Sequence, residues 1–291
     1  MKIVKFYGGL GNQMFQYAML IALKCTHNEH VLMDTSLYGS YGLHNGFELP
    51  LIFNITADKA TKEEIKKLSW YTTNYKLARL IHYVLPHKQT EYVERTYGTF
   101  YHEALSFEDD KAFDGYWQHW EYFDKYRETV LKEFSIRTPL DEINNSLYKT
   151  LIQSLQSVSI HIRRGDYLKS KLYKGICEVD YYRQAIISAK KIVGNDAHFY
   201  FFSNDFDWCT KHLADLIDSC YFHKVDWNTG TNSYKDMILM SACRINIIAN
   251  SSFSWWAAYL NQREDKNVIA PKLWINKKMP NPIQMQEWIK I

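Results

Sequence analysis

Apolar and polar residues at the start of the chain follow the pattern of an α/β domain. Residues 3–7 form a short apolar run typical of a β-strand, and a glycine-rich segment interrupts it. Apolar side chains then recur near helical spacing through residues 13–24, and a second strand-like run follows at residues 31–33. This order predicts a parallel sheet with a crossover helix. Residues 61–70 also have a helical pattern, whereas the rest of 55–115 has no clear period.

A second series of elements begins at Thr138 and Pro139. Thr138 suits a helix N-cap and Pro139 a first helical position, which predicts a helix ending near residue 155. Strands and helices then alternate, with strands expected at 158–163, 199–203, 245–249 and 267–270, and helices at 180–193, 234–243 and 255–260. This series predicts a second doubly wound domain. We therefore expect an α/β protein of two Rossmann-like domains, 1–137 and 138–291, facing across a cleft.

The composition fits a globular protein that binds a small anionic ligand. Hydrophobic residues make up 46% and charged residues 23% of the 291 positions, which is enough for a full core. The formal net charge is +3. That excess is too small and too scattered for a nucleic-acid-binding surface, but it suits a small anion. Aromatic residues reach 16%. Core packing explains most of them, and stacking on sugar rings would explain only a few.

The cysteines and the N-terminus indicate the compartment. The five cysteines are odd in number, form no CxxC pair and have no histidine cluster near them. This pattern disfavours a metal site or a disulfide framework, and favours a reducing compartment. We expect no bound cofactor. The first residues do not form a signal peptide, and no stretch approaches the roughly 20 apolar residues of a membrane span. We expect a cytoplasmic protein that can touch a membrane surface.

The most informative segment is Ser159 to Tyr167. Side chains alternate along a strand, so His161 and Arg163 share one face, and Gly165 then ends the strand. Arg163, Arg164 and Asp166 therefore follow the carboxyl end of a strand, the position that lines the ligand crevice in open α/β sheets. Two adjacent guanidinium groups suit a diphosphate, because each can donate paired hydrogen bonds to phosphate oxygens. The alternative is a structural Arg–Asp ion pair.

Two further strand ends carry polar residues. Asp205 ends a buried aromatic strand, and its carboxylate can accept two hydrogen bonds from the adjacent N–H donors of guanine. The alternative is that Asp205 caps the next helix. Ser251 and Ser252 precede a predicted helix, whose N-terminus would attract an anion. The alternative there is ordinary N-capping, and for Trp255 and Trp256 we expect a place in the core.

The glycine-rich N-terminal segment resembles a dinucleotide-binding fingerprint only in part. Asp34 lies at the distance expected for the acid that binds ribose, but the third glycine of the pattern is replaced by Met14. That glycine is needed for close packing of helix against strand. We therefore interpret Asn12 and Gln13 as amides that reach into the cleft. An NAD-dependent oxidoreductase remains one alternative. A non-catalytic glycan-binding protein is another, although it would not explain the polar strand ends.

The sequence closely resembles the bacterial branch of glycosyltransferase family 11, the α-1,2-fucosyltransferases. The resemblance runs nearly end to end, and the order of its motifs is highly specific. The motifs are GGLGNQMFQYA at 8–18, FELPLIFNI at 47–55, GYWQHWEYF at 115–123, HIRRGDY at 161–167, GICEVDYYRQAI at 175–186, FFSND at 201–205 and NSSFSWWAAYL at 250–260. The resemblance implies a GT-B-like fold. Residues 138–291 would then bind GDP-fucose, and 1–137 would be the acceptor side.

The resemblance also implies roles for individual residues. Arg163 or Arg164 would contact the β-phosphate, Asp205 would bind guanine, and His161 would contact the nucleotide. Further donor contacts are expected from the N-terminal loop and from the serines of the 250–260 motif, namely Asn12, Ser251 and Ser252. Asn204 departs from the pattern, because related sequences often have Asp there, and we expect the change to be tolerated.

The implied reaction inverts the anomeric carbon, from β-linked GDP-fucose to an α-1,2 linkage on a galactose-terminated glycan. Without a metal, arginine and helix N-terminal amides must stabilise the departing diphosphate. Asp166 is the first candidate for the base that activates the acceptor hydroxyl, or it orients an arginine; Glu178 and Asp180 follow. Asp180 is equally well explained as the N-cap of a helix over 181–193. Acceptor contacts are expected within residues 40–120, with Trp117 and Gln118 as candidates beside His119.

Overall fold

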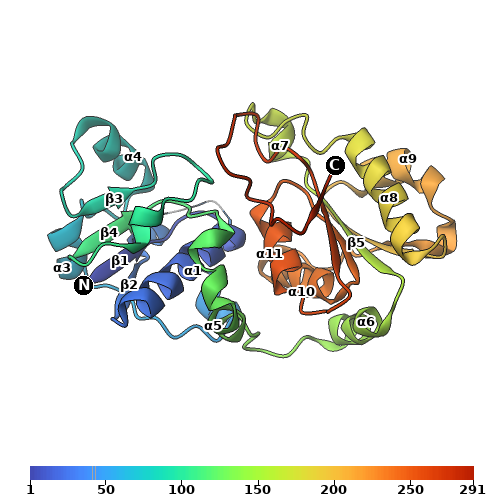
Figure 1. Cartoon of the computed structure of the whole chain (residues 1–291), viewed down its shortest axis with the longest axis horizontal. Coiled ribbons are helices and arrows are strands. Elements are labelled where there is room, and N and C mark those ends of the chain that lie inside the picture. The colour runs from blue at the N-terminus through green and yellow to red at the C-terminus, as the bar shows by residue number, and fades with distance from the viewer. Residues whose placement is uncertain (41, 43) are drawn as a thin grey trace. The chain divides into compact units, whose positions relative to one another are not determined.

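The computed structural model describes residues 1–40, 42 and 44–291, together with the backbone but not the side chains of residues 79 and 82. Positions 41 and 43, which belong to the region expected to contact the acceptor, lie outside this description. The chain separates into two compact units (Figure 1). Unit 1 comprises residues 1–138 and 279–283, and unit 2 comprises residues 139–278 and 284–291. The return of 279–283 to unit 1 was not predicted, since the sequence interpretation gave all residues after 137 to the second domain.

Unit 1 is built on a four-stranded parallel sheet of order β2-β1-β4-β3. Its strands are β1 Lys2–Lys5, β2 Val31–Asp34, β3 Glu91–Val93 and β4 Lys111–Asp114. Its α-helices are α1 Leu10–His27, α2 Leu49–Ile52, α3 Lys62–Leu68, α4 Tyr75–Val84 and α5 Arg127–Glu133. The predicted strand, helix, strand opening is confirmed. However, α1 begins inside the glycine-rich segment, with Gly9 as its N-cap.

Segment 279–283 completes the packing of unit 1 at Gly98. Ile283 is fully buried, and the backbone of Gly98 has φ +67°, which favours glycine. A Cβ atom at Gly98 would lie 2.4 Å from Met279 Cε and 2.8 Å from Ile283 Cδ1. The two side chains therefore lie directly against the glycine backbone, and this close approach explains why these residues belong to unit 1.

Unit 2 is built on a six-stranded parallel sheet of order β10-β9-β8-β5-β6-β7. Its strands are β5 Ser157–Ile162, β6 His198–Ser203, β7 Phe222–Lys224, β8 Ile245–Ile247, β9 Asn267–Ala270 and β10 Ile289–Lys290. Its α-helices are α6 Glu142–Gln153, α7 Asp166–Lys169, α8 Val179–Val193, α9 Phe206–Leu213, α10 Tyr234–Ala242 and α11 Ser252–Leu260. The predicted strands and helices of this half are confirmed, with shifts at their ends.

Two predicted helix caps of unit 2 are wrong. The cap of α6 is Asp141 rather than Thr138, because the Asp141 carboxylate accepts a hydrogen bond from the Asn144 N–H at 3.1 Å. Helix α8 begins at Val179 with Glu178 as its N-cap residue, so Asp180 lies in the first turn instead of capping. A carboxylate in that turn still interacts favourably with the helix dipole.

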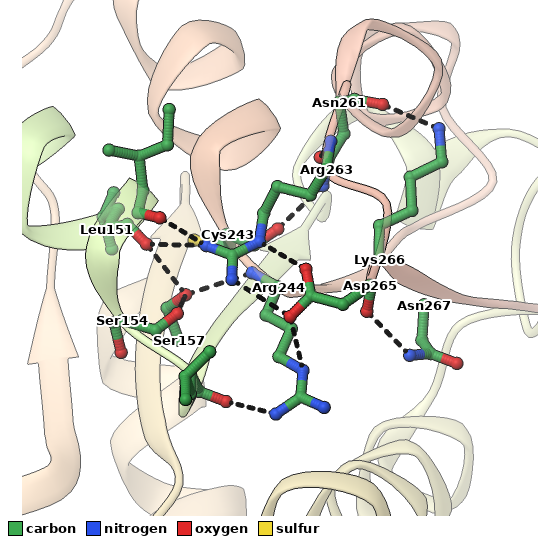
Figure 2. A network of polar contacts seen from close by, with 12 residues as sticks. Leu151, Ser154, Ser157, Cys243, Arg244, Asn261, Arg263, Asp265, Lys266 and Asn267 are labelled. Carbon is green, nitrogen blue, oxygen red and sulfur yellow. Dashed lines mark hydrogen bonds and ion pairs between the residues drawn. The ribbon is translucent and has the colours of Figure 1, made fainter.

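A polar network fastens the amino-terminal edge of the unit 2 sheet (Figure 2). Asp265 accepts hydrogen bonds from Arg263 Nε at 2.9 Å and Arg263 Nη2 at 3.2 Å, and it forms an ion pair with Arg244 Nε at 3.1 Å. Arg263 Nη1 also donates to the Ile152 carbonyl at 2.8 Å, near the end of α6. Because this network precedes β8 and β9, it lies at the edge opposite the predicted ligand-binding residues.

Candidate active site

The three polar strand ends of unit 2 belong to neighbouring strands. Strand β5 pairs with β8 on one side and with β6 on the other, all in parallel. The residues after these strands therefore share the carboxyl edge of the sheet, where ligands bind in open α/β folds. Arg163 and Arg164 follow β5, Asn204 and Asp205 follow β6, and Ser251 and Ser252 follow β8 and open α11. Segments about forty residues apart are thus brought to one edge.

Arg164 is held in place by its neighbours. Its side chain is 14% exposed, its Nε donates to Asp205 Oδ2 at 3.2 Å, and its Nη1 lies 3.6 Å from Glu178 Oε2. Its guanidinium lies 4.2 Å from the ring centroid of Trp208. The Arg164 N–H also donates to Asn204 Oδ1 at 2.9 Å. Arg164 is therefore a fixed cation that joins the end of β5 to the end of β6.

Asp205 has the helix-capping role that was the alternative interpretation. Its Oδ1 accepts a hydrogen bond from the backbone N–H of Trp208 at 3.1 Å, at the start of α9. Its Oδ2 takes the bond from Arg164, and 37% of the side chain is exposed. A carboxylate has about four acceptor positions. These two bonds therefore do not exhaust its capacity to meet a ligand.

Arg163 is more accessible than its neighbour. Its side chain is 37% exposed and pairs with Asp166, with 3.0 Å between Arg163 Nη2 and Asp166 Oδ1. The turn between them depends on Gly165, which has φ +61°. A Cβ atom there would lie 2.9 Å from Asn204 Nδ2. The glycine therefore allows the β5 end to approach the β6 end closely.

His161 is buried next to this edge. Burial, reinforced by the positive charge of Arg163, lowers the pKa of His161 to about 3, so its imidazole is neutral at physiological pH. Its Nδ1 has no hydrogen-bond partner among the described residues. Tyr182 Oη donates to the His161 carbonyl at 3.1 Å and fixes the backbone. His161 therefore suits a neutral hydrogen bond rather than charge stabilisation of a phosphate.

The start of α11 differs from ordinary side-chain capping. Ser251 occupies the N-cap position, but its side chain caps no backbone N–H of the helix. Instead, the Ser251 side chain hydrogen-bonds with the hydroxyl of Tyr167, whose pKa is raised by burial. Trp255 and Trp256 are fully buried, which confirms their expected place in the core. The first-turn amides of α11 therefore lie at the same edge as the arginines, as an anion would require.

The predicted residues of unit 1 do not form an open acceptor surface. Trp117 is fully buried and stacks on Tyr92 with 6.0 Å between ring centroids, so it belongs to the core rather than to an acceptor contact. Gln118 is 2% exposed. Its Nε2 donates to Asn12 Oδ1 at 2.6 Å, and its Oε1 accepts from Tyr97 Oη at 2.6 Å. His119 is also buried, and burial lowers its pKa to about 4.

The amide and the acid of the N-terminal segment have structural roles. Gln13 is fully buried, and its Nε2 donates to the carbonyl of Gly46 at 2.7 Å, so it does not reach into a cleft. Asp34 is also buried, and its Oδ1 accepts a hydrogen bond from the Ser36 N–H at 2.9 Å. Burial raises the pKa of this carboxyl. Asp34 therefore stabilises its own turn and does not serve as a ribose-binding acid.

Sequence reasoning missed a second group of polar strand ends, in unit 1. Lys5 is the last residue of β1 and Asp114 the last of β4, and 2.9 Å separates Lys5 Nζ from Asp114 Oδ2. Both side chains are largely buried. A cavity of about 280 Å³ lies beside them and is also lined by Tyr7, Tyr75 and Val93. The signal was available, because strands that end in a charged residue often meet at a ligand-binding edge.

Two further observations concern metals and membranes. Among residues 1–40, 42 and 44–291, no three His, Cys, Asp or Glu side chains gather in a group that could hold a metal ion. No helix in the described part of the chain combines the length and apolar character needed to cross a bilayer.

Known proteins resemble this chain over its whole length. The model of "Glycosyl transferase family 11" matches residues 1–291. An alpha-1,2-colitosyltransferase of Escherichia coli is 30% identical, over 99% of this chain and 98% of its own length. The O-antigen biosynthesis glycosyltransferase WbnK of Escherichia coli is 31% identical, over 98% of each chain. The galactoside alpha-(1,2)-fucosyltransferase 2 of Pongo pygmaeus is 25% identical, over 87% of this chain and 67% of its own.

Solved structures share the fold. The NodZ alpha-1,6-fucosyltransferase soaked with GDP-fucose has a TM-score of 0.54 at 13% identity, covering 89% of this chain and 92% of its own. This likeness confirms the GT-B-like α/β class predicted from the sequence. The comparisons do not support an oxidoreductase or a non-catalytic glycan-binding protein. Each of the two α/β units contains a parallel sheet, and the family model matches the chain from residue 1 to residue 291. The chain therefore belongs to glycosyltransferase family 11.

Proposed function

We propose that this protein transfers L-fucose from GDP-β-L-fucose to the 2-hydroxyl of a terminal galactose, with inversion, in glycan or O-antigen synthesis. The family gives the reaction class. Relatives named for alpha-(1,2)-fucosyl transfer to galactosides and for O-antigen biosynthesis favour this donor, linkage and acceptor. The observation that carries the proposal is the carboxyl edge of β8, β5 and β6, where two arginines and a helix N-terminus meet.

The donor-binding role belongs to residues 138–291. When the bond between fucose C1 and the β-phosphate oxygen breaks, negative charge develops on GDP and positive charge on the sugar ring. Arg163 is the more accessible arginine and suits the leaving diphosphate, with the α11 amides as further donors. Asp166 is paired with Arg163, which favours orientation of that arginine over the role of base.

The remaining donor contacts follow the same logic. Asp205 would accept the two adjacent N–H donors of guanine while Arg164 holds its other oxygen. His161 would offer a neutral hydrogen bond. Ser251 and Ser252 would border the phosphates. In unit 1, Asn12 is retained as a donor contact that Gln118 orients.

The acceptor-binding role belongs to residues 1–137. The cavity beside Lys5 and Asp114 replaces Trp117 as the candidate acceptor contact. It combines the aromatic rings of Tyr7 and Tyr75 with a carboxylate, and sugar hydroxyls need such acceptors beside an apolar surface. We further propose that the acceptor is carried on a membrane lipid and that the protein works at a membrane surface inside the cell; one relative is named for O-antigen biosynthesis.

The direct test is transfer with defined substrates. Purified protein is incubated with GDP-fucose and a lactose, Gal-GlcNAc or Gal-GalNAc acceptor, and the product linkage and anomer are determined by NMR. An α-linkage to galactose O2 is expected. Transfer only from UDP-sugars, or linkage to another hydroxyl, would contradict the proposal. A thermal-shift panel of GDP, UDP and NAD tests the nucleotide independently, and stabilisation by GDP is expected.

GDP-colitose is the second candidate donor, because a relative at 30% identity is named a colitosyltransferase. Colitose lacks the 3-hydroxyl of fucose. A site built to hydrogen-bond that hydroxyl would discriminate strongly against colitose, whereas an apolar pocket would discriminate weakly. Comparing kcat/KM for the two donors therefore decides which sugar the protein uses, and a higher value for GDP-colitose would replace fucose in the proposal.

A further inference from the structure

Helix α4 and the residue after it expose a cluster of apolar side chains. Leu80 is 55% exposed, Tyr83 89% and Val84 64%, and Leu77 and Leu85 are exposed as well. Elsewhere in the described part of the chain, large exposed apolar side chains occur singly or in pairs on separate elements. Scattered residues of this kind are ordinary, whereas a contiguous group marks a binding surface. In Figure 1, α4 lies at the periphery of unit 1, beyond β3.

The spacing of these residues gives α4 one apolar face. Leu77, Leu80 and Val84 follow the i, i+3, i+7 pattern of neighbours on a helix surface. Lys76 and Tyr83 are also seven positions apart and border this face. The buried Ala78 marks the side that packs on unit 1. We define the α4 patch by its exposed residues Lys76, Leu77, Leu80, Tyr83, Val84 and Leu85.

The segment that carries the α4 patch has a positive formal charge. Residues 70–88 contain three permanent cations, Lys76, Arg79 and Lys88, and no Asp or Glu, so their formal charge is +3. At the end of this segment, Trp70 Nε1 donates to the Pro86 carbonyl at 3.1 Å, and Lys88 Nζ lies 5.1 Å from the Trp70 ring centroid. The segment therefore combines an apolar face, the exposed Tyr83 and a net positive charge. The carboxylate of Glu91, which follows the segment, is 2% exposed and accepts hydrogen bonds from the backbone N–H groups of Trp70 and Lys88.

The charge decides which occupant fits the α4 patch. A second copy of the chain could cover its apolar face, but a symmetric contact would bring identical cations opposite one another. The surface of a bilayer with anionic lipid satisfies both features. Its acyl boundary accepts leucine, valine and tyrosine side chains, and its headgroups attract lysine and arginine.

We propose that the α4 patch docks this protein on the surface of a membrane that contains anionic phospholipid. The helix lies in the interface plane, with Leu77, Leu80 and Val84 inserted among the headgroups and Tyr83 at their level. This inference deepens the proposed function, because docking would keep unit 1 near an acceptor carried on a lipid. The docking itself depends only on the α4 patch and is measurable without any transfer reaction.

The test is co-sedimentation of the full chain with vesicles. Mixed phosphatidylethanolamine and phosphatidylglycerol vesicles should bind the wild-type protein, and pure phosphatidylcholine vesicles should bind it much less. Leu80→Ser with Val84→Ser removes exposed apolar surface and should lower the partition coefficient about tenfold or more. Lys76→Gln should lower it about fivefold and reduce its salt dependence. The matched control is Ile143→Ser with Ile152→Ser, two exposed aliphatic residues of α6, which should change nothing.

Activity with a soluble acceptor separates this inference from the proposed function. The Leu80→Ser, Val84→Ser variant should transfer to a soluble acceptor at the wild-type rate. With an acceptor carried on vesicles, its rate should fall below that of the wild type. Equal vesicle binding by wild type and the α4 variant would overturn docking, whatever the transfer assay gives. A wild-type dimer in sedimentation velocity that the α4 variant converts to monomer, with no vesicle binding, would assign the patch to a second copy instead. Vesicle binding without fucosyl transfer would uphold docking and contradict the proposed function.

Discussion

Arg163 and Arg164 are adjacent in sequence but have different surroundings. Arg164 is already bonded to Asp205 and lies over Trp208, whereas Arg163 is more exposed and forms an ion pair with Asp166. A cation that is held by neighbours orients a site, and an accessible cation can follow charge that develops during the reaction. The difference yields separate expectations for the two residues.

Substitution of Arg163 should act on the rate, and substitution of Arg164 on the architecture. Arg163→Ala should lower kcat by about tenfold or more with a small change in melting temperature, because a charged hydrogen bond contributes about 1.5–3 kcal/mol. Arg163→Lys should restore only part of the lost kcat, since lysine lacks the paired donor geometry of arginine. Arg164→Ala should lower both the melting temperature and the affinity for GDP. Steady-state kinetics and thermal unfolding measure these effects, and wild-type kcat in Arg163→Ala would contradict the assignment.

Two substitutions of Asp205 can separate its proposed guanine binding from its helix capping. Asp205→Ala should weaken GDP binding about tenfold or more and narrow the preference for GDP over ADP. It should also destabilise the protein by about 1 kcal/mol, because α9 loses its N-cap. Asp205→Asn keeps a cap and one acceptor, so both effects should be smaller. Calorimetric titration with GDP and ADP checks the first effect. A loss of stability with unchanged nucleotide preference would leave Asp205 only its capping role.

Two buried carboxyl groups should make stability depend on pH. Burial raises the pKa of Asp236 in unit 2 and that of Glu94 in unit 1 to about 7, from 3.8 and 4.5. Each folded-state pKa lies above its unfolded value. The contribution of each protonated carboxyl to the free energy of unfolding is therefore complete below about pH 4 and is lost as pH rises through 7. Asp236→Asn and Glu94→Gln mimic the protonated forms. Each should gain up to about 3 kcal/mol over wild type between pH 5 and 8, measured by urea unfolding. A gain that does not change with pH would exclude titration of that group.

At the scale of elements, the two edges of the unit 2 sheet have different tasks. The carboxyl edge carries Arg163 and Asp205, and the amino-terminal edge carries the network around Arg263 and Asp265 (Figure 2). Arg263 joins the end of α6 to the segment before β9 through the Ile152 carbonyl and Asp265. The proposed binding residues and the stabilising residues are thus separated by the length of the strands.

That separation predicts a change in stability without a change in binding. Arg263→Ala removes bonds to two backbone carbonyls and to Asp265, so unit 2 should lose about 1–3 kcal/mol of stability. The Kd for GDP should stay at the wild-type value at a temperature where the variant is folded. Denaturant unfolding and calorimetry on the same preparation measure both quantities. A parallel loss of GDP affinity would mean that the two edges are coupled.

The strand ends were predictable from the sequence, but the burial of single side chains was not. Local alternation around Ser159 to Tyr167 was enough to put polar residues at the end of β5. The environment of Arg164 depends on Trp208 and Asp205, which follow another strand, so no local pattern reveals it. The prediction that Trp117 contacts the acceptor was wrong for the same reason, because Tyr92 of β3 stacks on the Trp117 ring. Strands β3 and β4, of three and four residues, were too short to show a period.

At the scale of the whole molecule, the proposed mechanism assigns the charge needed for GDP departure to the protein's own cations. Transfer should therefore survive excess EDTA, since arginine and the α11 amides supply the positive field. The assay compares initial rates with EDTA, with Mg²⁺ and with Mn²⁺. A preparation that loses all activity in EDTA and regains it with either cation would contradict this prediction.

Segment 279–283 has a consequence for how the chain is made. The ribosome delivers residues 1–138 first, yet unit 1 includes Ile283, which is fully buried, and Met279, which lies against Gly98. During synthesis, the surface that these side chains cover is exposed to other nascent chains and chaperones until residues 279–283 have been made. An isolated fragment of residues 1–138 should bind a hydrophobic dye, and fusing residues 279–283 through a flexible linker should suppress that binding. Unit 1 is thus finished only after most of unit 2 has been synthesised.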